Sequence, residues 1–174
     1  MYMSCTSYGN LSLSDLCLLE SILAWYNEDE GNVRRFVEVV KRKNGMSLRV
    51  IDWLVTNFSK VHSVVINAQS GIPVDLNRDY QKNLVAYNKK NMDPFARRNK
   101  IKISLFAKEE RSSTVGQLNF FRWYYKNGIN VYLNKHRDMV EHHMKENEGK
   151  HQSRARGCRV FPVKSFSGRL NMTF

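Results

Sequence analysis

The sequence has 174 residues, of which 42% are hydrophobic and 11% aromatic; this composition favours one folded domain and excludes an intrinsically disordered chain. Its 28 lysines and arginines against 16 acidic residues give a net charge of +12, which predicts a polyanionic or acidic partner. No apolar run approaches the roughly 18 residues of a membrane span, and the polar first ten residues do not resemble a signal peptide.

Three helices are predicted in the first sixty residues. Ser12 and Asp15 form a cap-like pair ahead of leucines and isoleucines at helical spacing. Ser47 caps the third helix in the same way, and an acidic run over residues 27–31 is expected to form a loop between the first two. The predicted helices cover residues 12–27, 32–44 and 47–58.

Beyond residue 60 the sequence pattern predicts both strands and helices. A β-branched run over residues 61–66 predicts a strand, residues 71–74 a weaker one, and the alternating residues 101–106 the clearest strand of the sequence. Between them, Asn77 or Asp79 is expected to open a helix that stops before Pro94.

The last two predicted helices follow. Thr114 and Gln117 have the spacing of a capping box, Gly128 suits the C-terminal end of that helix, and a final helix is expected over residues 130–147. Together these elements predict an α+β fold: a mainly helical single domain over residues 1–148 with a small antiparallel sheet. Residues 149–174 are expected to form a basic, extended C-terminal tail.

This tail has six cations and no acidic residue. It is either a solubilising end or a basic arm that docks on phosphate or on an acidic groove. Its apolar residues favour docking, because a purely solvating tail has no use for them. The tail residues predicted to bind are Arg154, Arg156, Arg159, Phe161 and Phe166.

Catalytic and cofactor motifs are absent from the sequence. There is no Gly-rich phosphate loop, no nucleophile elbow and no HExxH motif. His136, His142 and His143 lack the i, i+4 spacing of a zinc pair, so a solvated helix face is the favoured interpretation. We therefore predict a protein that is not an enzyme and that needs no metal or cofactor.

The most distinctive segment is basic, runs from Tyr87 to Lys102, and has Asp93 as its one acidic residue. Cations neutralise phosphates and aromatic rings stack on bases, so this segment suits nucleic acid. Two alternatives remain: Phe95 belongs to the core beside an exposed turn, or Arg97 and Arg98 pair with carboxylates of a neighbouring protein. The binding residues predicted here are Lys89, Lys90, Phe95, Arg97, Arg98, Lys100 and Lys102.

Residues 114–125 contain five aromatic side chains, more than one core face needs. Most of them are expected in the core, and part of the cluster is expected to anchor a partner, since Trp, Tyr and Arg dominate interface hot spots. Arg122, between two of these rings, is a further binding candidate.

Three segments in this order, Trp53–Lys60, Asp93–Arg98 and Thr114–Trp123, resemble a family of small basic, largely uncharacterised proteins of nucleocytoplasmic large DNA viruses. The resemblance covers roughly residues 11–146. Members of that family have Cys where Ala96 stands, which argues against thiol chemistry at this position.

The resemblance implies a virus-encoded protein of the virion, or of the viral factory in the host cytoplasm or nucleus. Cys5, Cys17 and Cys158 form no CxxC pair, which also favours a reducing compartment over secretion. The first expected function is a minor capsid or other virion component that binds neighbouring capsid or core proteins. The alternative is sequence-independent DNA or RNA binding in the viral core or factory.

Overall fold

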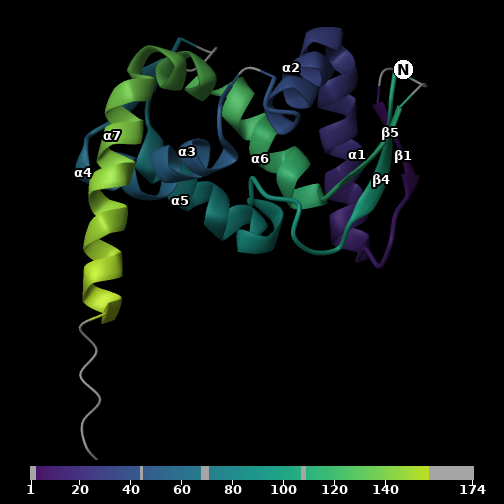
Figure 1. Ribbon diagram of the computed structural model, residues 1–174. Coiled ribbons are helices and arrows are strands. Elements are labelled where there is room, and N and C mark those ends of the chain that lie inside the picture. The colour runs from purple at the N-terminus through teal and green to yellow at the C-terminus, as the bar shows by residue number, and fades with distance from the viewer. Residues whose placement is uncertain (1–2, 44, 68–70, 107–108, 157–174) are drawn as a thin grey trace, which may run out of the picture.

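Helices dominate the structure, and a three-stranded antiparallel sheet lies beside α1 at the end of the molecule opposite α7 (Figure 1). The computed structural model describes residues 3–43, 45–67, 71–106 and 109–156. Within these ranges the predicted fold class, mainly helical α+β with a small antiparallel sheet, is confirmed.

The helical elements are α1 (Leu13–Glu28), α2 (Glu30–Val40), α3 (Leu48–Trp53), the π-helical turn η1 (Leu54–Phe58), α4 (Ser59–Val61), α5 (Leu76–Tyr87), the 3-10 turn η2 (Lys89–Asn91), α6 (Val115–Lys126) and α7 (Ile129–Arg156). The strands are β1 (Met3–Ser7), β2 (Val65–Asn67), β3 (Pro73–Asp75), β4 (Ile101–Leu105) and β5 (Glu109–Ser113). The larger sheet has the order β1-β4-β5, and β2 pairs with β3 in a separate two-stranded sheet.

The sequence pattern missed both edge strands of the larger sheet. β1 and β5 are short and largely polar, and they pair antiparallel with the central β4 through backbone hydrogen bonds. Only the central strand carries the buried alternation of Ile101, Ile103 and Leu105 that a sequence pattern reveals. The predicted strand over residues 61–66 is also wrong in its first four residues, because the helical stretch that starts at α3 continues through Val61 and β2 begins only at Val65.

Several helix boundaries also differ from the prediction, among them the start of α5, which Asp75 caps instead of Asn77 or Asp79. The acidic run is a junction of one residue: Asp29 caps α2, its Oδ1 accepting a hydrogen bond from the Gly31 amide at 2.9 Å. At the other end of the chain, α7 continues to Arg156, about two turns beyond the predicted end. Residues 148–156 contain no proline to stop it, so the first part of the predicted tail is helical.

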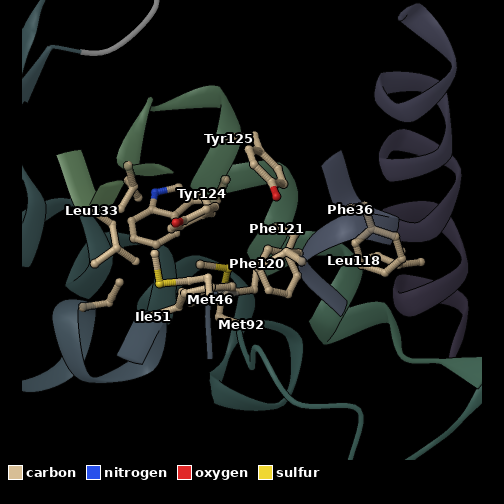
Figure 2. Packing of buried hydrophobic residues seen from close by; sticks show 14 of the residues in the cluster. Phe36, Met46, Ile51, Met92, Leu118, Phe120, Phe121, Tyr124, Tyr125 and Leu133 are labelled. Atoms are coloured by element: carbon tan, nitrogen blue, oxygen red, sulfur yellow. The ribbon is translucent and has the colours of Figure 1, made fainter. Parts of the chain in front are cut away.

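The core is built around α6 (Figure 2). All five aromatic side chains of this helix are at most 6% exposed, and Phe36 of α2 meets Phe121 edge to face at 5.9 Å. The buried hydroxyl of Tyr125 donates to the Arg35 carbonyl at 2.8 Å. The prediction that part of this cluster anchors a partner is therefore wrong, because the rings fill the centre of the domain.

Residues 53–60, the first of the three segments that carry the resemblance, hold α7 against the rest of the domain. Trp53 Nε1 donates to His143 Nδ1 at 3.0 Å, and the Phe58 ring lies 5.3 Å from the same imidazole. His143 therefore accepts a hydrogen bond at Nδ1 and belongs to a packed aromatic contact. In the described residues, no group of three histidine, cysteine or acidic side chains is placed to hold a metal ion.

Candidate functional site

The basic segment folds as a loop that lies directly on α6. Gly116, in the first turn of α6, makes this approach possible, because a Cβ atom there would lie 2.2 Å from the carbonyl oxygen of Lys90. Only glycine allows two backbones to come so close. Two of the segments that carry the family resemblance, 93–98 and 114–123, are thus parts of one structural unit.

Polar side chains of α6 hold the backbone of this loop. Gln117 Nε2 donates to the Pro94 carbonyl, and Asn119 Nδ2 donates to the Asn91 carbonyl, both at 2.9 Å. The N-cap of α6 is confirmed, since Thr114 Oγ1 accepts from the Gln117 amide. The second half of the predicted capping box is wrong: the Gln117 side chain reaches the loop instead, and its Oε1 accepts from Ser113 Oγ. Buried amides that satisfy loop carbonyls fix the loop in one conformation.

Asp15, at the start of α1, ties the same loop to a third element. Its buried carboxylate accepts hydrogen bonds from Lys90 Nζ at 3.0 Å, Asn91 Nδ2 at 2.8 Å and Ser12 Oγ at 2.8 Å. Burial alone would raise the pKa of this carboxyl, but the three hydrogen bonds and the Lys90 charge outweigh burial and lower its pKa to about 2. The ionised form of Asp15 thus stabilises the loop.

Replacing Asp15 by asparagine should lower the free energy of unfolding at neutral pH by about 2 kcal/mol. Because the folded pKa lies below the usual 3.8, this contribution is present above about pH 4 and is lost as the pH falls towards 2. Urea unfolding of both proteins at pH 7 and near pH 3 measures it. The difference in stability should shrink in acid; an unchanged difference would mean that the charge of Asp15 contributes nothing.

The loop surrounds a surface hollow of about 320 Å³, which we call the basic hollow. The Arg97 guanidinium lies over the half-buried Phe95 ring, with Cζ 4.4 Å from the ring centre, and its Nε is 3.4 Å from the Asp93 carboxylate. The lining of this hollow contains four basic side chains, all of them exposed, and one acidic side chain. The hollow is lined by Lys89, Lys90, Asp93, Phe95, Arg97, Arg98 and Thr114.

A second hollow of about 300 Å³ adjoins the first, and the two share Lys89, Asp93 and Arg97. We call it the Asp52 hollow. Its other lining residues are Asp52, Thr56, Tyr80, Met92 and Pro94. The shared lining places the two hollows side by side along the loop.

Two groups in the Asp52 hollow have shifted pKa values. Burial, and after it the charge of Asp93, raises the pKa of the Asp52 carboxyl. Burial and the same pair of carboxylates raise the pKa of the Tyr80 hydroxyl to about 12. Within the described part of the chain, neither the Asp52 carboxylate nor the Tyr80 hydroxyl has a hydrogen-bond partner. Shifted, unpaired polar groups in a hollow are typical of ligand sites.

The structure brings together five of the predicted binding residues: Lys89, Lys90, Phe95, Arg97 and Arg98. Lys100 and Lys102 are exposed beyond the loop and do not line either hollow. Arg154 and Arg156 lie in the last turn of α7, away from the loop, whereas Arg159, Phe161 and Phe166 fall outside the described residues.

Arg122 has an internal role in the structure. Its guanidinium donates to Ser21 Oγ at 2.9 Å and to Asn119 Oδ1 at 2.7 Å, and burial lowers its pKa. It thereby links α1 to the same asparagine that holds the loop. Because these contacts occupy its head group and it lines neither hollow, we correct its assignment from a binding residue to a residue that positions the loop.

Several residues of the site had no recognisable signal in the sequence. Asp52 and Tyr80 belong to different helices, and no local pattern brings them together. A usable signal existed at Gly116, because a glycine inside a helix indicates close backbone approach. Asp15 was predicted only as part of a cap, which it is, but its contact with Lys90 depends on the fold.

None of the described helices combines the length and the apolar character needed to cross a membrane. No solved structure matches the chain. "Uncharacterized protein L507" of Acanthamoeba polyphaga mimivirus is 28% identical in an alignment over 148 residues that covers 80% of this chain and 57% of that protein. The chain thus spans little more than half the length of this relative.

These matches confirm the predicted link to a viral, largely uncharacterised family. The segment that a family model matches also extends further along the chain than the resemblance seen in the sequence, because it includes the end of α7. The model of a family of unknown function, DUF7197, matches residues 10–160 with all three motifs inside, and the chain belongs to that family.

Proposed function

We propose that this protein binds nucleic acid through the basic hollow, by neutralising backbone phosphates. The observation that carries the proposal is the convergence of four exposed cations on a concave surface with a single opposing carboxylate. Lys90 and Arg97 each have one ion-pair partner, whereas the described residues offer none to Lys89 and Arg98. Release of counterions from the phosphates then drives binding.

The stacked pair of Phe95 and Arg97 favours a single strand over a duplex. An aromatic ring and a guanidinium in contact form a partly apolar surface, and both are groups on which an unpaired base can stack. The loop that carries them is held by Asp15, Gln117 and Asn119, so little conformational entropy is lost when a strand binds.

The alternative of a protein partner has less support from this surface. Stable protein interfaces centre on large aromatic or apolar anchors, and the basic hollow offers only the half-buried Phe95. The aromatic side chains of α6 that could anchor a partner are inside the core. A structural role in the virion stays a prediction from the resemblance. Because the chain has a relative in a virus, the ligand that we propose is a viral nucleic acid, in the factory or in the particle.

Titration of fluorescent single-stranded and duplex DNA with the full chain, at two salt concentrations, tests the proposal. We expect binding to the single strand in low salt, with log affinity falling linearly against log salt by about 0.7 per phosphate neutralised. About four phosphates should be involved, one for each cation of the hollow. Absence of binding in low salt would reject the proposal, and affinity that barely responds to salt would favour a protein-type interface.

A further inference from the structure

We propose that the Asp52 hollow binds a guanine base of the single strand whose phosphates occupy the basic hollow. This inference rests on the proposed function and goes beyond it, because it adds base preference to a surface expected to bind phosphate alone. Three features of the Asp52 hollow carry it: its position, its unpaired polar groups and the arrangement of donors and acceptors along its wall.

The position of the hollow suits a base attached to a bound phosphate. Lys89, Asp93 and Arg97 separate the two hollows and line both of them, so a strand that contacts this wall reaches both sides at once. The volume of about 300 Å³ falls in the usual range for small-molecule sites. Pro94 and the Tyr80 ring are the apolar part of its lining, whereas Met92 is fully buried beneath them.

The polar groups of the hollow lack partners that a base can provide. The Asp52 carboxylate is partly buried, faces the charge of Asp93 and accepts no hydrogen bond from the described residues. The Tyr80 hydroxyl faces the same two carboxylates at the surface of the hollow. The Asp52 carboxylate is therefore open to a ligand that donates two hydrogen bonds to it in place of solvent.

Guanine matches this arrangement better than the other bases. It presents two adjacent N–H donors, at N1 and N2, on its Watson–Crick edge, and one carboxylate can accept both. Its O6 and N7 are the acceptors that lysine and arginine side chains bind in direct readout, and Lys89 and Arg97 line the same hollow as Asp52. Thymine and adenine have no pair of adjacent donors, so they leave the carboxylate partly unsatisfied.

The test uses the full chain and three single strands of about twelve nucleotides: alternating guanine–thymine, alternating inosine–thymine, and thymine alone. Inosine keeps N1–H, O6 and N7 but lacks the amino group at N2. We expect the guanine strand to bind about tenfold more tightly than thymine alone, and the inosine strand to bind in between. Equal affinity for the three strands would overturn the inference.

The variant Asp52→Asn should remove most of this preference, so that the guanine and thymine strands bind with nearly equal affinity. Asp138→Asn, an exposed carboxylate on α7, is the matched control and should keep the preference, because it makes the same change in charge elsewhere. If Asp52→Asn keeps the preference, guanine is not read by this hollow and the inference fails. If the wild-type protein binds none of the strands, the proposed function itself fails, so the two failures are distinguishable.

Discussion

Reversing the charges of Arg97 and Arg98 to glutamate should weaken binding of single-stranded DNA by about a hundredfold in low salt. Two of the four cations of the basic hollow become anions that repel the phosphates. Replacing Arg97 also removes the guanidinium from the Phe95 ring. The salt dependence should fall as well, by about 1.4 in the slope of log affinity against log salt, since two phosphate contacts are lost.

This double variant should keep its fold. Both side chains are exposed, and the one ion pair lost, between Arg97 and Asp93, lies at the surface, where such pairs contribute at most about 1 kcal/mol. Circular dichroism and the thermal midpoint of each protein check this point before binding is compared. A lower affinity can then be assigned to the site.

The matched control is Lys135→Glu with Lys145→Glu, two exposed lysines on α7. It makes the same change in net charge, so it measures how much of the loss comes from the overall field of a protein with a charge of +12. We expect this control to lose less than about fivefold. Equal losses in the two double variants would show that binding is diffuse and that the basic hollow is not the site.

Helix starts could be predicted from the sequence because capping is a local interaction. Ser12, Ser47 and Thr114 each accept a hydrogen bond from an amide two or three residues further along the chain. The basic segment could be recognised for the same reason, since its cations are close in sequence. In both cases, the interacting residues are neighbours in the chain, so spacing alone carries the information.

The features of the site that could not be predicted from the sequence depend on contacts between distant segments of the chain. Gln117 has the right spacing for a capping box, yet its side chain reaches Pro94, 23 residues away in the chain, because the loop lies above it. From the sequence, Arg122 was expected to be an exposed cation. In the structure it donates a hydrogen bond to Ser21, which lies on another helix. The Asp52 hollow joins residues from three parts of the chain, and no period or motif relates them.

The loop and α6 depend on each other, which makes Gly116 the most sensitive position of the site. The variant Gly116→Ala would favour the helix itself, since alanine is the better helix former by up to about 1 kcal/mol. Its Cβ, however, would lie 2.2 Å from the Lys90 carbonyl oxygen, and a backbone atom cannot rotate away. Either the η2 turn or α6 must shift, which strains the hydrogen bonds of Asn119 and Asp15 to the loop.

We therefore expect Gly116→Ala to lose about 3 kcal/mol of stability, equivalent to a fall of about 6–12 °C in the thermal midpoint. Below that midpoint, its affinity for single-stranded DNA should also fall, because the displaced loop no longer presents its cations together. Differential scanning calorimetry and the binding titration measure the two effects.

The control is Gly31→Ala in the first turn of α2, where the added Cβ meets only the Asp29 carboxylate, at 3.0 Å. That side chain can move, so the cost should stay below about 1 kcal/mol and DNA binding should not change. If Gly116→Ala proved as stable as Gly31→Ala, the loop would not rest on α6 as closely as the structure shows. If it lost stability but kept full affinity for DNA, the cations would not need the rigid loop, and preorganisation would have no part in binding.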